Sequence, residues 1–382
     1  PGQPVPQDLA DHISEGGLMF ALNSRFDRLA WNAKMPDYGF PPLALEQVLD
    51  VAAQNRASLL PSGLQQASMA MRLPKKPKLG KDMMKIYATA GNDVVIPYDR
   101  ADKDFDAFVM YGIHDTRVTG KLLSRTRPLS RDEWIDFIIS EDINDRGIEI
   151  DVEFCEAAAA LFNDEKEANK LECQELTNGE VQNVTFAKGL ALWVRANINN
   201  EELADMIVTA RDEDDNPTNF SLDSKKVLPR LLEAASRADP PIPANVQQLL
   251  ELLVHARSSS ALKFRQMANH AIDARRYGSF IFGGAGQTRR FSSTGPQMHN
   301  MPRAHVEHEG EAMADICNGM TAAELRDKYG IPISKLLAML VRPSITAAEG
   351  KTLVWGDWSA IEARILAWIS GSRSAQKLSL IH

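Results

Sequence analysis

The sequence predicts a mixed α+β protein with two or more domains. Its 382 residues exceed the usual size of a single domain, and 44% hydrophobic with 25% charged residues is ordinary globular composition. A front region of short apolar runs is followed by a long helical region, and then by strands that alternate with helices. We therefore expect a mixed front, a helical middle and a mixed end.

The front region holds both strand and helix signals. Residues 17–22 form an apolar run of strand length, and residues 43–60 predict one or two helices. Residues 104–123 predict another helix, because its large apolar side chains recur on one face. Residues 72–85 contain six basic residues against one acidic residue and two prolines, which indicates a solvated basic loop.

The helical middle is introduced by two clear signals. A capping box at residues 130–133 opens a helix, and residues 146–151 alternate like a strand. From residue 153 to about 272 the pattern is largely helical. Polar or proline-rich breaks interrupt it at 211–217 and 240–243.

The end of the chain returns to strands. Residues 279–282 predict a short strand before a glycine-rich turn, and helices return over 310–338. A last strand is expected at 352–355, leading to Asp357. The helix that follows has an apolar stripe made of Ile361, Ile365, Leu366 and Ile369.

The charge of the chain is unevenly distributed. The net charge is −8, yet residues 220–303 hold twelve Lys or Arg against five Asp or Glu, so this segment carries +7 and the remainder −15. A basic segment in an acidic protein indicates a site for a polyanion. A solvated positive face explains the same charge equally well.

Several classes of protein are excluded by composition. No stretch approaches 18 apolar residues, so we expect no membrane-spanning helix. The first residues do not show the pattern of a signal peptide, so we expect no secretory signal. The three cysteines are scattered, which indicates a reducing compartment without disulfides. The chain opens on Pro1, so we expect a processed chain or a piece of a longer one.

Two patterns carry chemistry on their own terms. Asp357 ends an apolar strand, where a carboxylate can bind a divalent metal or cap the next helix, and the cap is the commoner role for a lone Asp. Tyr111 and Asp115 are four residues apart, so they share one helix face. Alone, that pair is more often a simple surface feature. The histidines at 299, 305 and 308 fit exposed loops better than a zinc site.

The segment around Asp357 also resembles motif A of family A DNA polymerases, which reads Asp-Tyr-Ser-x-Ile-Glu-x-Arg. Asp357 and Glu362 match that motif, and Trp358 replaces its Tyr. The remaining matches are Ser359, Ile361 and Arg364.

Residues 284–303 are similar to a second block of the family, Gly-Ala-x-x-Thr-Gly-Arg-x-Ser…Gln-x-Gln-Asn-x-Pro. In the family this block lies along the minor groove of the primer-template. Arg290 takes the place of its Arg, whereas Arg289 replaces a Gly and His299 replaces the second Gln. The region ending at Lys263 is similar to the thumb of the phage polymerases.

The front is similar to the proofreading exonuclease of the same family. Asn23 to Asp27 matches exonuclease motif II, Asn-x-x-Phe-Asp, and Tyr111 to Asp115 matches motif III, Tyr-x-x-x-Asp. The resemblance implies metal-binding carboxylates at Asp27 and Asp115 and a water-orienting phenol at Tyr111. It also implies four regions: a partial ribonuclease H-like exonuclease domain (1–128), a connector with the first palm strand (129–151), a helical thumb (152–272) and a partial palm (273–382).

The resemblance therefore implies a bacteriophage-type DNA polymerase with a 3′–5′ exonuclease. Asp357 would be catalytic and would bind one of two Mg²⁺ or Mn²⁺ ions. Trp358 and Glu362 would contact the nucleotide, and Glu362 would exclude a 2′ hydroxyl. The expected partners are primer-template DNA, deoxynucleoside triphosphates and no membrane, in the cytoplasm of a bacterial host; a processivity factor stays open. The side chains expected on DNA are Lys263, Arg290, Gln297 and Asn300.

The resemblance is incomplete. No Asp-x-Glu of exonuclease motif I precedes Asp27, and polymerase motifs B and C have no counterparts after motif A. We expect a chain truncated at both ends that does not polymerise DNA, because Asp357 is its single implied polymerase carboxylate. Two alternatives remain: a non-catalytic module that binds primer-template DNA, and a single-subunit RNA polymerase. Glu362 and the exonuclease-like front argue against the second alternative.

Overall fold

The computed structural model describes residues 6–74, 103–224, 226–256 and 260–374. The chain divides into two compact units, Pro1–Ile345 and Thr346–His382. Within the described residues, no helix is long and apolar enough to span a membrane. Most of the expected basic loop at 72–85 lies outside the described residues, as do residues 375–382.

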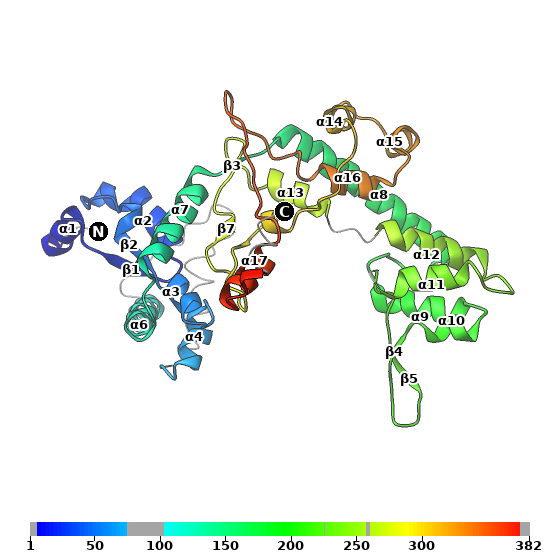
Figure 1. Cartoon of the computed structure of the whole chain (residues 1–382), viewed down its shortest axis with the longest axis horizontal. Helices are drawn as coiled ribbons and strands as arrows, with labels where there is room; N and C mark the ends of the chain where they lie inside the picture. The colour runs from blue at the N-terminus through cyan, green and yellow to red at the C-terminus, as the bar shows by residue number, and fades with distance from the viewer. Residues whose placement is uncertain (1–5, 75–102, 225, 257–259, 375–382) are drawn as a thin grey trace. The chain divides into compact units, whose positions relative to one another are not determined.

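The front of the first unit is built on a pair of parallel strands (Figure 1). Strand β1 (Met19–Ala21) pairs with β2 (Val48–Asp50), with Met19 opposite Val48. The expected strand at 17–22 is confirmed. The helices of this region are α1 (Gln7–Ser14), α2 (Ser24–Lys34), η1 (Met35–Tyr38), η2 (Leu45–Gln47), α3 (Val51–Ala57), α4 (Leu64–Ala70) and α6 (Lys103–Arg125).

The prediction for residues 43–60 was only half right. Helix α3 is present, but β2 precedes it, because Val48 is buried and its backbone pairs with β1. The helix predicted over 104–123 is confirmed as α6. Its Val118 and Leu122 are buried against α3 and α4. The apolar face predicted from spacing is not the buried one, because its Val109 and Ile113 are 42% and 38% exposed.

Helix α7 (Arg131–Arg146) starts at the predicted capping box. The Glu133 amide donates to Ser130 Oγ at 3.2 Å, and the Ser130 amide donates to Glu133 Oε2 at 2.8 Å. Near its other end, the Asn144 side chain bonds both backbone groups of Phe280, accepting from its N–H at 2.8 Å and donating to its C=O at 2.9 Å. Helix α7 is thereby fixed against the strands that follow the helical middle.

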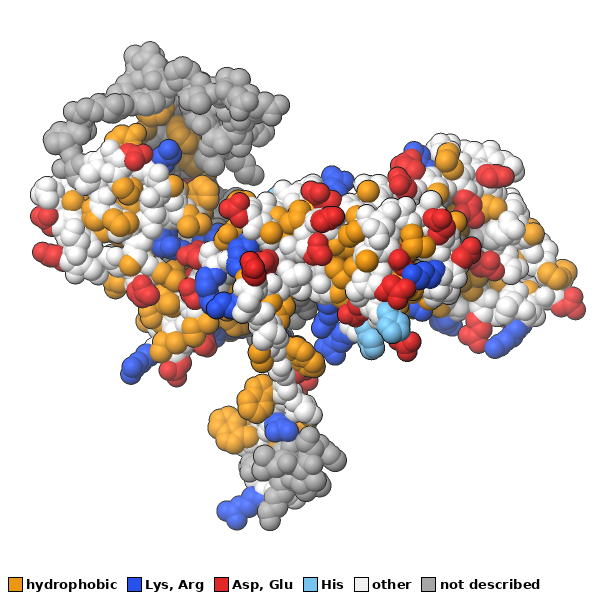
Figure 2. All heavy atoms as spheres, turned by 90° about the horizontal axis from the view of Figure 1, so that it is seen from above, with side chains coloured by type: hydrophobic (Ala, Val, Ile, Leu, Met, Phe, Trp, Pro, Cys, Tyr) orange, Lys and Arg blue, Asp and Glu red, His pale blue; other side chains and the backbone are white. Residues whose placement is uncertain are grey.

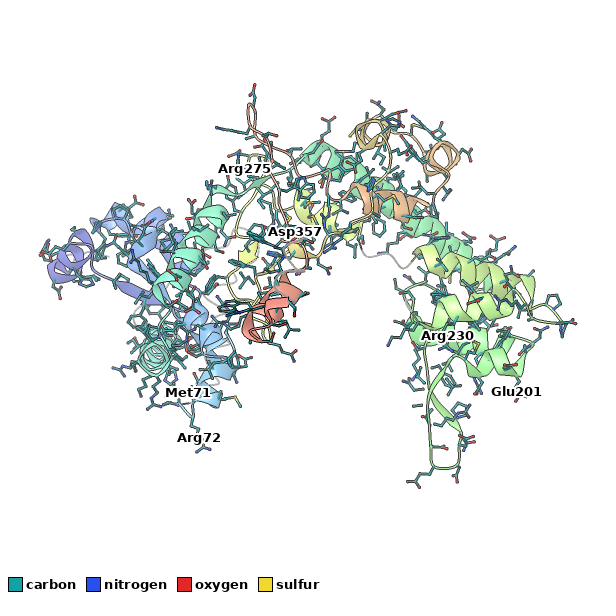
Figure 3. All side chains as sticks on the ribbon, viewed as in Figure 1. Met71, Arg72, Glu201, Arg230, Arg275 and Asp357 are labelled. Carbon is teal, nitrogen blue, oxygen red and sulfur yellow. The ribbon has the colours of Figure 1, made fainter. Side chains whose placement is uncertain are left out.

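Those strands form two small antiparallel pairs. Strand β3 (Ile148–Glu149), expected from the alternation at 146–151, pairs with β6 (Arg275–Arg276). Arg275, labelled in Figure 3, donates to Glu149 Oε2 at 2.9 Å across this pair. The strand predicted near 279–282 is confirmed as β7 (Phe280–Ile281), which pairs with β8 (Ser292–Ser293).

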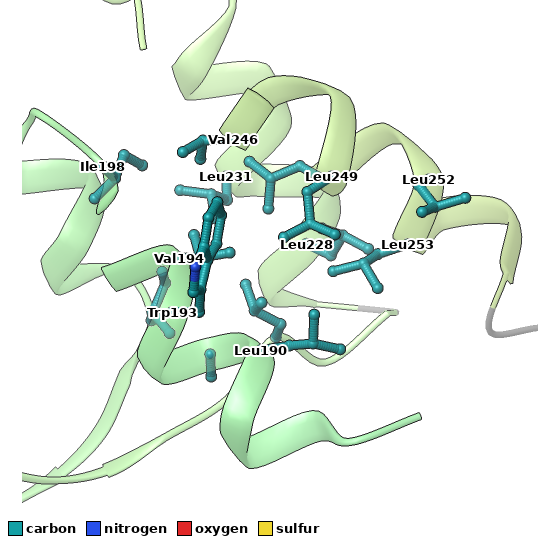
Figure 4. Packing of buried hydrophobic residues seen from close by; sticks show 14 of the residues in the cluster. Leu190, Trp193, Val194, Ile198, Leu228, Leu231, Val246, Leu249, Leu252 and Leu253 are labelled. Atoms are coloured by element: carbon teal, nitrogen blue, oxygen red, sulfur yellow. The ribbon is translucent and has the colours of Figure 1, made fainter. Parts of the chain in front are cut away.

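The helical middle is organised by α8 (Val152–Leu176). Asp151 caps it, since its Oδ1 accepts from the Phe154 amide at 2.9 Å. The second half of α8 leads into a core of buried Leu, Val and Trp side chains, shown in Figure 4. That core is supplied by α9 (Ala187–Asn197), α10 (Glu201–Asp205), α11 (Val227–Ala235) and α12 (Ala244–Ala256).

The predicted break at 211–217 is more ordered than expected. It is the turn of a hairpin made by β4 (Val208–Arg211) and β5 (Pro217–Phe220). The Asp212 carboxylate closes this turn by accepting from the amides of Asp214 at 3.0 Å and Asn216 at 2.8 Å. A polar run with such a closing Asp is a turn signal, and the short strands beside it are too weakly apolar to be recognised alone.

The first half of α8 packs into a second core. Phe154 meets Phe264 of α13 (Leu262–Ala268) edge to face, with ring centroids 5.4 Å apart. The helices expected over 310–338 complete this core; they are α14 (Glu309–Cys317), α15 (Ala322–Tyr329) and α16 (Ile333–Leu340). On the face drawn in Figure 2, acidic and basic side chains are intermixed on the surface.

The second unit contains one described helix, α17 (Ile361–Ile369), as predicted. The predicted strand at 352–355 is wrong: residues 351–358 have no regular structure. Val354 and Trp355 are 90% and 89% exposed. An apolar run becomes a strand only when a neighbouring strand takes its hydrogen bonds, and the described part of this unit offers none.

Candidate functional site

A polar groove brings together three of the four residues expected on DNA. It has a volume of about 440 Å³ and lies between α13 and the segment that follows β8. Lys263 comes from α13, while Gln297 and Asn300 come from η3 (Met298–Asn300) and its N-cap. The lining residues are Ser260, Leu262, Lys263, Gln266, Gly295, Gln297, Asn300, Met301 and Pro302.

Lys263 lines the groove and also donates hydrogen bonds to the backbone of the neighbouring segment. Its Nζ donates to the carbonyl oxygen of Pro296 at 2.6 Å and to that of Gln297 at 3.4 Å. Partial burial lowers the pKa of its ammonium group. An ammonium has three donors, so Lys263 can fix the backbone of this segment and still reach a phosphate.

Gln297 and Asn300 are held by a tight local turn. The backbone of Gln297 is left-handed, with φ of 55°, and its carbonyl accepts from the Asn300 amide at 2.8 Å. Both side chains are exposed. The intervening His299 packs its ring on Phe280 and Phe291, with centroids 5.2 and 6.5 Å away. Partial burial lowers the pKa of His299.

Arg290 does not line the groove. It is exposed in the turn between β7 and β8, whose ends are closed by two backbone hydrogen bonds. The Arg289 amide donates to the Ala285 carbonyl at 2.7 Å, and the Ala285 amide donates to the Arg290 carbonyl at 3.0 Å. The four expected DNA residues therefore divide into three in the groove and one on this turn.

Arg289 is a residue whose role sequence reasoning missed. Its φ is 54°, in the left-handed region, where a side chain costs of order 1 kcal/mol. The polymerase block has Gly at this position, so the departure from that Gly was the available signal. The Arg289 guanidinium donates to Glu133 Oε1 at 2.8 Å, which ties the turn to the start of α7.

The proposed exonuclease residues lie on two helices that both contact β1. Asp27 of α2 and Asp115 of α6 line one pocket of about 290 Å³. Tyr111 stands one helical turn before Asp115 but does not line this pocket. The lining residues are Phe20, Ala21, Leu22, Asp27, Leu64, Asp115, Thr116 and Thr119.

Asp50 is a second residue that the sequence did not single out. It ends β2, and its Oδ2 accepts from the Ser24 amide at 2.9 Å and the Ser24 hydroxyl at 3.2 Å. Its Oδ1 caps α3 by accepting from the Ala53 amide at 2.7 Å. Partial burial raises the pKa of Asp27, and the nearby charge of Asp50 adds to this rise. An Asp directly after a short apolar run was the signal for Asp50.

The carboxylates present fit one divalent cation better than two. Among the described residues, no group of three or more His, Cys, Asp or Glu side chains could hold a metal ion. Mg²⁺, however, commonly takes one or two carboxylates and completes its shell with water and substrate phosphates. Asp27 and Asp115 suit that arrangement.

Asp357 lies in the second unit, on the exposed segment before α17 (Figure 3). It is not a helix cap, because Ala360 occupies the N-cap position of α17. Trp358 is 73% exposed, and Glu362 is in the first helical turn. No described carboxylate completes a set of three with Asp357, so the described residues do not fit a two-metal site and no reaction step is derived through one.

The fold of the chain resembles a DNA polymerase domain. It matches the POL domain of Pol1 from M. smegmatis, whose structure is a complex with DNA primer-template and dNTP, with a TM-score of 0.51 and 16% identity. The match covers 97% of this chain and 53% of that one. The helix-rich mixed fold predicted from the sequence is therefore confirmed.

The sequence of the chain is similar to that of a phage DNA polymerase. The chain is 24% identical over 324 residues to the DNA polymerase of Bacillus phage SP02, which covers 82% of this chain and 45% of the relative. The expected resemblance to a phage-type DNA polymerase is confirmed. No family model matches the chain. The chain spans about half the length of the proteins that it matches.

Proposed function

We propose that the chain is a family A DNA polymerase whose described part binds primer-template DNA. The observation that carries this proposal is the groove in which Lys263, Gln297 and Asn300 meet. It is supported by the fold, which resembles a polymerase domain solved with primer-template and dNTP. The relative from a Bacillus phage supports replication in a bacterial cytoplasm as the setting.

The groove suits DNA of any sequence. The amides of Gln297 and Asn300 are exposed donors and acceptors, and every base pair shows acceptors in its minor groove. Lys263 adds a positive charge for phosphate contacts, which position DNA without reading its sequence. A polymerase needs this sequence tolerance because its primer-template changes at every step.

The nucleotide site is proposed on the second unit. Asp357 would bind metal, while Trp358 and Glu362 would meet the incoming nucleotide, with Glu362 against the 2′ position of its sugar. The exposure of Asp357 and Trp358 supports this assignment, since both are open to a ligand. A divalent metal at such a site polarises phosphate oxygens.

The front is proposed to be a ribonuclease H-like 3′–5′ exonuclease domain. The pocket shared by Asp27 and Asp115 supports this, with one Mg²⁺ or Mn²⁺ ion as its cofactor. A bound cation supplies Lewis-acid polarisation of the phosphate. Tyr111 would orient water from the preceding turn of α6. Metal-dependent shortening of a single strand from its 3′ end is the activity to measure.

Primer-template affinity tests the groove directly. Lys263→Ala combined with Asn300→Ala should weaken binding about tenfold, because a phosphate contact and a groove hydrogen bond are lost together. Fluorescence anisotropy with a labelled primer-template measures the dissociation constant. Arg230→Ala is the matched control, since Arg230 is exposed on α11 and does not line the groove.

The outcome of that comparison decides the proposal. If Arg230→Ala weakens binding as much as the double variant, attraction is diffuse and the groove is not the DNA site. If the wild-type chain does not bind primer-template at all, the proposed function fails.

A second candidate is a DNA-binding module without chemistry. The observation that favours it is that no group of three or more His, Cys, Asp or Glu side chains among the described residues could hold a metal ion. Binding of primer-template together with neither primer extension nor 3′ shortening would support this second function. Either activity would support the polymerase assignment.

A further inference from the structure

Two neighbouring arginines in the turn between β7 and β8 have different environments. Arg290 is exposed to solvent, whereas Arg289 is partly buried and donates to Glu133 Oε1 at 2.8 Å. The guanidinium of Arg289 is therefore turned toward α7. Its positive charge is compensated within the protein and is poorly placed to meet a phosphate.

The backbone conformation at Arg289 explains the importance of its ion pair with Glu133. With φ of 54°, the residue adopts a left-handed conformation that glycine takes without strain. A non-glycine residue persists there only when surrounding contacts hold it. The ion pair with Glu133 is such a contact, and backbone hydrogen bonds of Ala285 close the same turn.

Glu133 has further hydrogen-bond partners besides Arg289. Arg127 makes a bidentate contact with its carboxylate: Nη1 donates to Oε2 at 2.7 Å, and Nη2 donates to Oε1 at 2.9 Å. The Ser130 amide adds a hydrogen bond to Oε2 at 2.8 Å. Close to the turn, Arg56 donates to the Phe282 carbonyl at 2.8 Å. The turn is therefore fixed from α3 and from α7.

We propose that Arg289 is a positioning residue that holds the β7–β8 turn through Glu133 so that Arg290 is presented to the DNA. The inference rests on the proposed binding of primer-template DNA. It assigns separate roles to the two arginines: Arg290 contacts DNA, and Arg289 acts on DNA only through Arg290.

Salt-dependent affinity separates those roles. A cationic side chain that meets DNA displaces condensed counterions, so it steepens the slope of log affinity against log salt concentration. Arg290→Ala should therefore lower both the affinity and the slope. Arg289→Gly should weaken binding about fivefold through lost pre-organisation but leave the slope unchanged.

Combined variants test the proposed order of action. In the Arg290→Ala background, Arg289→Gly should have no further effect on affinity. Glu133→Gln should weaken binding like Arg289→Gly, and the two together should be no worse than either alone. Ser130→Ala is the control for damage to α7, because it removes the cap and leaves the Arg289–Glu133 pair in place; its affinity should match the wild type.

A readout without DNA separates this inference from the proposed function. Hydrogen exchange of the peptide covering residues 283–293 should be faster in Arg289→Gly than in the wild type. A lowered salt slope in Arg289→Gly, wild-type affinity of that variant, or unchanged exchange would each overturn the positioning role. If the wild-type chain does not bind primer-template, the proposed function fails and this inference fails with it.

Discussion

Glu133 receives charge-assisted hydrogen bonds from two arginines that lie 162 positions apart in the chain, Arg127 and Arg289. The contact with Arg127 is the main cause of a pKa well below the ordinary value for Glu133, and Arg289 and the Ser130 amide lower it further. Because its carboxylate is charged in the native state, this residue makes the stability of the protein depend on pH.

The sign of that linkage can be measured. Glu133 stabilises the protein above its ordinary pKa of 4.5, and this stability is lost as the pH falls through its lower native pKa. Glu133→Gln should therefore lower the free energy of unfolding at pH 7 by about 1 kcal/mol. The difference from the wild type should shrink below about pH 4.5.

Urea unfolding at pH 7 and pH 3.5 measures this effect. Glu251→Gln, at an exposed site on α12, is the control and should change stability little at either pH. A Glu133→Gln penalty that is the same at both pH values would contradict the linkage, since a neutral contact has no such dependence.

At the scale of elements, helices α2 and α6 bring together carboxylates that are far apart in the sequence. Asp27 and Asp115 line one pocket because both helices pack beside β1. If this pocket is the exonuclease site, Asp115→Asn should reduce 3′ shortening of a labelled single strand at least about a hundredfold, since a metal-binding charge is lost.

The matched control for that measurement is on the same helix. Asp106 is exposed on α6 and does not line the pocket, so Asp106→Asn should retain the activity. Equal activity of Asp115→Asn and the wild type in Mn²⁺ or Mg²⁺ would rule out the proposed exonuclease site. Loss of activity in both variants would indicate a general effect of charge on α6.

Elements with local signals were predicted well. The capping box located the start of α7, and apolar spacing located α6 and α17. Strands were harder, because a strand depends on a partner that the sequence does not name. Residues 48–50 form strand β2 because they pair with β1. The run at 352–355 is more apolar, but it has no partner strand among the described residues and is not a strand.

The candidate site was predictable to a similar extent. Motif resemblance identified Lys263, Gln297 and Asn300, which the structure places in one groove. It could not identify the Arg289–Glu133 pair, because the two residues are 156 positions apart and the pairing depends on a left-handed backbone. Arg290 was expected with the groove residues and instead lies on the neighbouring turn.

At the scale of the whole molecule, DNA binding and nucleotide transfer make different demands on the chain. The proposed DNA binding uses the groove and the turn, and both belong to the first unit. Transfer by two metals needs more than one carboxylate to hold four positive charges near the phosphates. The described residues of the second unit supply Asp357 without a carboxylate partner set.

We therefore expect the 382-residue chain to bind primer-template DNA without extending it in Mg²⁺. Asp357→Asn and removal of metal by a chelator should both leave the dissociation constant unchanged, because neither alters the groove. An independent polymerase added to the same sample should extend the primer, which verifies the substrate. Mg²⁺-dependent extension by the chain that disappears in Asp357→Asn would contradict the prediction. In that case a carboxylate outside the described residues would have to complete the metal site, since one carboxylate does not hold two cations beside a triphosphate.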